Sequence, residues 1–204
     1  MTALPTARAV FIDKDGTLVE NVPYNVDPAL LRLTPNALEG LRLLQAAGYR
    51  LIVVTNQPGI AYGWFGLGEL ENLSRGLTGL LAAGGVALDG FFFCPHSPTP
   101  PGERGCPCRK PAPGLLQQAA QVHRLNLAEC WMVGDILDDI EAGRRSDCRT
   151  VLLDVGNETE WKASPLRVPH HRVGDLREAA SAILADGEGA GARVRPVPQP
   201  QEWS

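Results

Sequence analysis

Short apolar runs alternate along the chain with segments of helical periodicity. The apolar runs have strand length and cover residues 8–12, 50–55, 88–93, 130–133 and 150–153. Between them apolar positions recur at helical spacing, which predicts helices over residues 35–48, 67–83, 114–124, 136–145 and 174–184. Strands that are apolar at nearly every position are typical of a parallel sheet that is buried on both faces.

This alternation predicts an α/β fold: a Rossmann-like, doubly wound parallel sheet with helices on both sides. The sequence has no internal repeat, so we expect one domain over residues 1–185. Residues 186–204 are rich in glycine and proline and have no periodicity, which predicts a disordered tail.

The composition excludes several classes of partner. Hydrophobic residues make up 44% and charged residues 21% of the chain, and the formal net charge is −4, so it lacks the basic stripe of a nucleic-acid-binding protein. The longest uncharged run, residues 51–68, contains a proline and four glycines and does not suit a membrane span. No apolar signal-peptide segment precedes Asp13. We therefore expect a cytoplasmic protein that binds neither nucleic acid nor membrane.

Polar residues follow three of the predicted strands. The first strand ends at Asp13 and Asp15, the second at Thr55 and Asn56, and the strand over residues 130–133 leads to Asp135. In doubly wound sheets the ligand site lies outside the carboxyl ends of the strands. Carboxylates gathered there would repel one another, and a hard divalent cation with oxygen ligands relieves that repulsion. Mg²⁺ is the usual cation where phosphates are handled.

These residues resemble the motifs of the haloacid dehalogenase superfamily. Residues 13–17, Asp-Lys-Asp-Gly-Thr, resemble its first motif, Thr55 its second, Lys110 its third, and residues 134–139 its fourth. One Asp-x-Asp pair is weak evidence, but four motifs in the family's order over residues 8–140 are specific. Lys14 is a departure, because the family usually has arginine at that position.

The resemblance implies a magnesium-dependent phosphatase, a phosphoric monoester hydrolase. By the family pattern Asp13 attacks phosphorus and carries the phosphoryl group, and Asp15 protonates the leaving oxygen and then deprotonates the attacking water. Asp13, the main-chain carbonyl of Asp15, and Asp135 would hold Mg²⁺. Thr55 and Lys110 would bind the phosphoryl oxygens.

Asp138 and Asp139 have two interpretations. Both lie in the first turn of the helix predicted over residues 136–145, where acidic side chains are favoured by the helix dipole. Each is therefore either a cap or support for the site.

The five cysteines do not suggest a disulfide framework, because their number is odd and no signal peptide is evident. Three of them lie with one histidine in and beside the proline-rich loop of residues 95–112, and three thiols with one imidazole make a tetrahedral zinc set. The members of this set are Cys94, His96, Cys106 and Cys108. We expect a structural zinc there. Cys130 and Cys148 are expected in the core.

The cysteine loop resembles that of a capless branch of the superfamily, which contains heptose-bisphosphate and histidinol-phosphate phosphatases. In this branch the last cysteine leads directly into Arg-Lys-Pro, as Cys108 does here. Residues 56–65 and Tyr24 resemble the heptose enzymes more closely. The resemblance implies a small phosphorylated sugar as substrate, D-glycero-D-manno-heptose 1,7-bisphosphate hydrolysed at the 7-phosphate.

Three residues would contact this substrate: Asn56, Arg109 and Lys110. Arg109 is the candidate for the second, remote phosphate, because a guanidinium can grip a phosphate in two places. Ile136 is a departure, since the heptose enzymes typically carry lysine after the motif aspartate.

Other functions remain open. A histidinol-phosphate phosphatase should place acids near the substrate amine, and no convincing pair is evident; another small phosphomonoester is also possible. A non-catalytic binding module on this fold is disfavoured by Asp15, which has no purpose in binding alone. A mutase would usually need a cap to exclude water, and residues 19–33 and 56–67 are too short for a cap domain. We expect a monomer.

Overall fold

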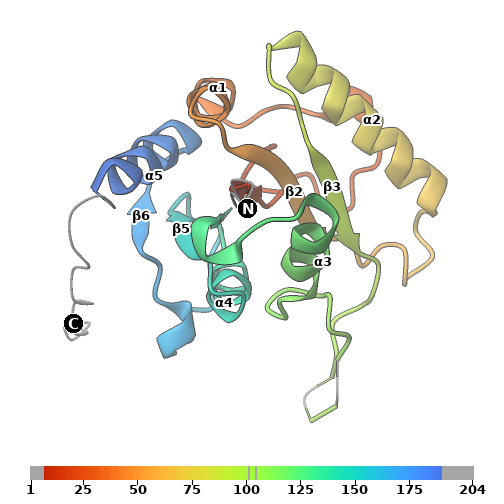
Figure 1. Ribbon diagram of the computed structural model, residues 1–204. Helices are drawn as coiled ribbons and strands as arrows, with labels where there is room; N and C mark the ends of the chain where they lie inside the picture. Colours follow the sequence, from red (N-terminus) through yellow and green to blue (C-terminus); the bar gives the residue numbers. More distant parts are fainter. Residues whose placement is uncertain (1–6, 101, 104, 190–204) are drawn as a thin grey trace.

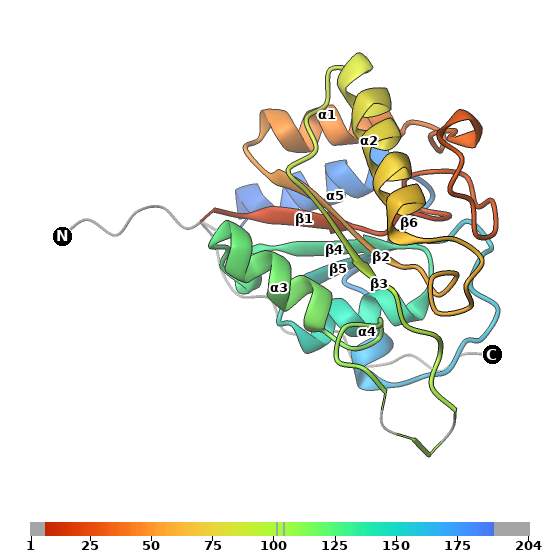
Figure 2. The ribbon, with the colours of Figure 1, turned by 90° about the vertical axis from the view of Figure 1, so that its right-hand side faces the viewer.

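Six parallel strands form the centre of the protein. The computed structural model describes residues 7–100, 102–103 and 105–189. The strand order is β3-β2-β1-β4-β5-β6, and every neighbouring pair runs parallel. The strands are β1 (Ala9–Ile12), β2 (Arg50–Asn56), β3 (Gly90–Cys94), β4 (Trp131–Gly134), β5 (Arg149–Leu153) and β6 (His171–Val173). Because all are parallel, their carboxyl ends lie on one edge, at the right of Figure 2.

Helices cover both faces of this sheet (Figures 1 and 2). The helices are α1 (Ala37–Ala46), α2 (Leu67–Ala83), α3 (Gly114–His123), α4 (Leu137–Arg145) and α5 (Leu176–Gly189). The first, second and fifth pack on one face, and α3 and α4 on the other. In β1, Val10 and Ile12 join the core of the first face, whereas Phe11 joins the core of the second. All four residues of β1 are therefore buried, as predicted for a doubly covered strand.

The predicted fold class is confirmed, and α2 has the bounds expected from the sequence. The other predicted elements agree within two residues at each end, except at the end of α5. That helix continues through Gly189, so residues 186–189 are helical where the sequence predicted the start of a tail. The remainder of the predicted tail, residues 190–204, lies outside the described residues.

The sequence pattern missed β6, which has only three residues, two of them polar. It also missed three short 3₁₀ helices: Pro28–Leu30, Leu127–Glu129 and Pro165–Arg167. The segments after β1 and β2 hold turns and the first of these 3₁₀ helices, so they form no large cap over the strand ends. No helix in the part of the chain that is described is long and apolar enough to cross a membrane.

Candidate active site

Lys110 connects the acids that follow two of the strands. Its ammonium Nζ pairs with the carboxylate of Asp13 and, at 2.6 Å, with Asp139 Oδ1. It also donates to the main-chain carbonyl of Val54, at 2.9 Å. Burial alone would lower the pKa of Lys110, but the two carboxylates raise it above its ordinary value. Lys110 is therefore a buried, charged cation at the centre of the site.

Three buried carboxylates gather in the site, and two of them, Asp13 and Asp139, pair with this single ammonium. Oxygens of Asp13, Asp135 and Asp139 lie within 4.8 Å of one another. Burial and the charge of Asp13 raise the pKa of Asp135 to about 6. Burial also raises the pKa of Asp139, against the opposing effect of Lys110. One ammonium does not neutralise three carboxylates, and the donors are all oxygens, so the cluster fits a hard divalent cation such as Mg²⁺.

Two neutral donors hold the Asp135 carboxylate. Thr17 Oγ1 donates to its Oδ1 and Asn157 Nδ2 to its Oδ2, each at 2.8 Å. Gly16 has a φ of +88°, and a Cβ there would collide with this carboxylate, so glycine is needed for the close approach. The sequence pattern did not indicate Asn157, whose only signal is that it lies on the segment after the carboxyl end of β5.

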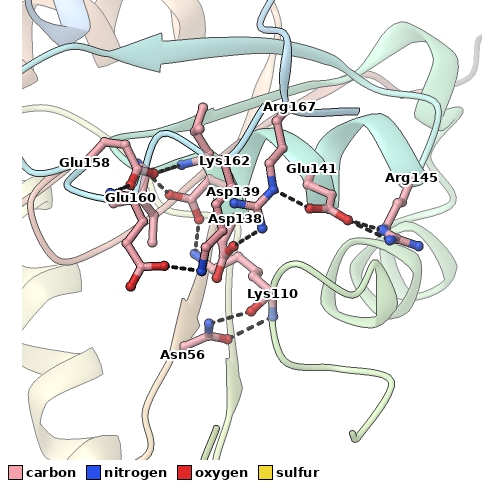
Figure 3. A network of polar contacts seen from close by, with 12 residues as sticks. Asn56, Lys110, Asp138, Asp139, Glu141, Arg145, Glu158, Glu160, Lys162 and Arg167 are labelled. Atoms are coloured by element: carbon pink, nitrogen blue, oxygen red, sulfur yellow. Dashed lines mark hydrogen bonds and ion pairs between the residues drawn. The ribbon is translucent and has the colours of Figure 1, made fainter. Parts of the chain in front are cut away.

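The structure separates Asp138 from Asp139. Asp139 is fully buried and faces Lys110. Asp138 instead pairs with Arg167 at 2.7 Å, and Figure 3 shows Arg167 bridging it to Glu141. Asp139 Oδ2 also accepts a bond from the Ile136 amide at 3.4 Å and so caps α4 as well. Of the two acids that the sequence left open, only Asp139 belongs to the cluster of carboxylates around Lys110.

The Asp15 carboxylate is held by one side chain on each oxygen. The buried ammonium of Lys14 pairs with Oδ1, and Gln57 Nε2 donates to Oδ2 at 3.1 Å. Burial raises the pKa of Asp15, Lys14 opposes this, and Asp13 adds to it. The side chain remains 30% exposed. Asp15 is thus oriented, accessible, and more easily protonated than an ordinary aspartate.

Gln57 is a second residue that the sequence analysis missed. Besides Asp15, its Nε2 donates to the hydroxyl of Thr55 at 3.0 Å. Since that hydroxyl accepts a bond from Gln57, its own hydrogen is available for another acceptor. The signal in the sequence that could have indicated Gln57 is its position two residues after Thr55, the threonine of the second motif.

The Asn56 side chain forms two hydrogen bonds with the main chain of Lys110, as Figure 3 shows. Its Nδ2 donates to the Lys110 carbonyl, and the Lys110 amide donates to its Oδ1, both at 3.1 Å. The sequence predicts a substrate-binding role for Asn56. In the structure both polar atoms of the Asn56 side chain bond to the main chain of Lys110, so this side chain supports the lysine.

The predicted zinc ligands form one cluster. The sulfur–sulfur distances among Cys94, Cys106 and Cys108 are 3.2–3.6 Å, and His96 Nδ1 lies 3.3–3.5 Å from two of the sulfurs. With usual zinc bond lengths, the edges of a tetrahedron would be roughly 3.8 Å between two sulfurs and 3.5 Å between sulfur and nitrogen. The set therefore closes to nearly the size of a four-ligand zinc site.

The cysteine cluster is joined directly to the segment that carries Lys110. The Arg109 amide donates to Cys106 Sγ at 3.3 Å, and Arg109 Nη1 donates to the His96 carbonyl at 3.2 Å. Burial opposes the change, but the Arg109 amide and the neighbouring thiols lower the pKa of Cys106 to about 7. A thiol that ionises this readily suits a metal ligand, because the thiolate is the form that binds.

Curated phosphatases resemble this chain over most of its length. It is 37% identical over 150 residues to the D-glycero-beta-D-manno-heptose-1,7-bisphosphate 7-phosphatase of Pseudomonas aeruginosa, a match that covers 74% of this chain and 82% of the relative. The enzyme of the same description from Pasteurella multocida is 38% identical over 152 residues, which cover 73% of this chain and 83% of the relative. The chain belongs to this family of HAD-like phosphatases.

The family membership makes the protein a phosphoric monoester hydrolase of the HAD type. Residues 107–179 also match the family described as HAD-hydrolase-like. A solved relative is the D,D-heptose 1,7-bisphosphate phosphatase from B. bronchiseptica, complexed with magnesium and phosphate. It is 27% identical with a TM-score of 0.71, and the match covers 89% of this chain and 99% of that chain.

Proposed function

We propose that the protein removes the 7-phosphate of D-glycero-D-manno-heptose 1,7-bisphosphate through a phosphoenzyme formed on Asp13. The observation that carries the chemistry is the position of Lys110 between Asp13 and Asp139, beside an Asp15 that is held on both oxygens. The names of the curated relatives support the choice of sugar.

Asp13 is the proposed nucleophile. Its amide donates to the Val133 carbonyl at 3.0 Å, which ties the end of β1 to β4. One Asp13 oxygen would attack phosphorus in line with the sugar oxygen, giving an acyl phosphate as the ester bond breaks. The Thr55 hydroxyl would donate to a phosphoryl oxygen. The Lys110 ammonium would exchange one of its present contacts for another phosphoryl oxygen.

Asp15 is the proposed acid and base. In its protonated form it would give a proton to the leaving sugar oxygen, and in the second half of the reaction its carboxylate would take a proton from the water that attacks phosphorus. That attack breaks the bond between phosphorus and the Asp13 oxygen and restores the enzyme. Lys14 and Gln57 would keep the carboxyl group in place through both halves.

Two metals complete the proposal. Asp13, Asp135 and the main-chain carbonyl of Asp15 would hold Mg²⁺, which when bound neutralises the charge of the phosphoryl group. Cys94, His96, Cys106 and Cys108 would hold a structural Zn²⁺. The second metal would stabilise the segment that leads into Arg109 and Lys110.

A hydrolysis screen with Mg²⁺ tests the proposed function. Phosphate release would be measured for the heptose bisphosphate and other sugar mono- and bisphosphates, with Asp13→Asn as the inactive control. Rapid quench of the wild type with labelled substrate should trap an acyl phosphate on Asp13. Label on any other residue would overturn the assignment.

Arg109 is proposed to bind the remote phosphate with the guanidinium donors that His96 does not use. Arg109→Ala should lower kcat/KM for the bisphosphate by roughly ten- to a hundredfold, the effect of losing a charge-assisted hydrogen bond. The matching monophosphate should lose less, and Arg75→Ala, an exposed arginine on α2, should change neither. Equal losses on both substrates would favour a general phosphomonoester phosphatase.

A further inference from the structure

Three exposed aromatic side chains meet in one cluster, which we call the aromatic platform. Its members are Tyr24, Tyr62 and Trp64, which are 48%, 42% and 59% exposed. The Trp64 ring lies 4.3 Å from the ring of Tyr24 and 4.8 Å from that of Tyr62, between centroids. Large aromatic groups gain free energy from burial, so a contiguous exposed set usually marks a binding surface.

The aromatic platform is built from the segments that follow the first two motif strands. Tyr24 lies on the segment after β1, nine residues beyond Asp15. Tyr62 and Trp64 lie on the segment after β2, which begins at Gln57, the residue that donates to Asp15. Figure 2 shows both segments at the edge of the sheet where β1 and β2 end. The platform therefore stands on the same side of the sheet as the catalytic carboxylates.

The backbone holds these rings in place. The Tyr62 amide donates to the Pro58 carbonyl at 3.1 Å, and the Trp64 amide donates to the Gly59 carbonyl at 2.9 Å. Tyr24 has a φ of +56°, a left-handed conformation that a bulky residue rarely adopts. Unusual backbone conformations persist where the surrounding structure enforces them, and they gather at ligand sites. The exposed rings are thus a preorganised surface.

We propose that the aromatic platform binds the carbohydrate part of the phosphorylated substrate, with a C–H face of the sugar ring stacked on Trp64. The proposal rests on the function proposed above. The three side chains carry no charge, so they do not suit a phosphate group. Their apolar faces suit the C–H groups of a sugar ring, and the two tyrosine hydroxyls suit its hydroxyl groups. Arg109 and Lys110 would bind the phosphates, while the platform recognises the ring between them.

The test compares a cyclic with an acyclic substrate. The kcat/KM values for the heptose bisphosphate and for acetyl phosphate, which has no ring, would be measured for wild type, Trp64→Ala, Tyr62→Ala and Trp64→Phe. Trp64→Ala should lower kcat/KM for the heptose bisphosphate by roughly five- to tenfold, mainly through KM, because it removes one stacking partner. The kcat/KM of Trp64→Ala for acetyl phosphate should change less than about twofold. Trp64→Phe keeps an aromatic ring and should therefore retain most of the wild-type kcat/KM for the heptose bisphosphate.

Trp161→Ala is the matched control, since Trp161 is a 50% exposed tryptophan outside the aromatic platform. It should leave both substrates unchanged. Retained activity on acetyl phosphate shows that a variant is folded. If Trp64→Ala keeps the full preference for the sugar, the platform does not bind it, and the cleft lined by Glu20, Asn21 and Asn157 becomes the better position.

Two further outcomes would overturn the inference. A change of oligomeric state in Trp64→Ala, with unaltered KM, would make the platform an interface between copies. A wild type that hydrolyses acetyl phosphate but no sugar phosphate would show that the platform has no sugar substrate to bind. A wild type inactive on both would refute the proposed function itself, which distinguishes that failure from failure of the platform alone.

Discussion

Replacing Asn56 by alanine separates a support for Lys110 from a substrate contact. The side chain makes two hydrogen bonds, one with the amide and one with the carbonyl of Lys110. Alanine removes both. The Lys110 ammonium would keep its contacts with Asp13, Asp139 and the Val54 carbonyl, so the lysine should stay in the site but lose the anchor of its main chain.

The size of the effect follows from these two bonds. A hydrogen bond contributes about 0.5–1.5 kcal/mol net, so two contribute about 1–3 kcal/mol. This free energy is divided between the stability of the fold and the placement of Lys110. If half of it is lost from transition-state binding, kcat should fall by roughly two- to thirteenfold. KM should change little, because Asn56 would not touch the substrate.

Steady-state kinetics and urea unfolding measure the two parts. Asn72→Ala replaces an exposed asparagine on α2 and is the matched control. It should leave kcat unchanged and should alter the free energy of unfolding by no more than about 0.5 kcal/mol. A variant in which KM rises while kcat and stability stay at wild-type values would refute this reasoning. It would return Asn56 to the substrate-binding role predicted from the sequence.

Three other predictions follow from the packing and charges of the site. Gly134→Ala should lower the free energy of unfolding, measured in urea, by roughly 1–3 kcal/mol, because the new Cβ would collide with Asp139. Gly79→Ala lies at an open helical position and should not lower it. Equal losses in the two variants would contradict the steric explanation. The pKa of Asp135 is raised to about 6, so protons compete with Mg²⁺ for this carboxylate. The Mg²⁺ concentration for half-maximal activity should therefore rise as the pH falls below 6, approaching about tenfold per pH unit. If this concentration does not change with pH, Asp135 is not a ligand. Metal analysis should find about one zinc per chain, and Cys106→Ser should lose zinc and have a lower kcat. Full activity of the zinc-free wild type would show that zinc does not support the segment that carries Lys110.

Much of the architecture was readable from local patterns. Strands buried on both faces must be apolar at nearly every position, and helices packed on one side repeat their apolar residues at helical spacing. Both signals are carried by residues close together in the sequence, so α2 and the first five strands were found. The missed β6 has one apolar residue and lies at the edge of the sheet, where its side chains need no continuous apolar pattern.

The polar residues at the strand ends were also predictable from the sequence, because parallel topology alone brings Asp13, Thr55 and Asp135 to one edge. Tertiary structure decided which further side chains reach them. Adjacent residues of a helix point in directions about 100° apart, so only the packing of α4 on the sheet directs Asp139 to Lys110 and Asp138 to Arg167.

The supporting contacts depend on tertiary structure for the same reason. Asn56 holds a main chain 54 positions away, and Asn157 holds a carboxylate 22 positions away. Such pairs leave no periodic signal, because their partners become neighbours only after the strands have taken their order in the sheet. The sequence by itself therefore determined the fold, the motif residues and the ligands of the expected zinc. The three-dimensional packing decided which polar side chains orient them.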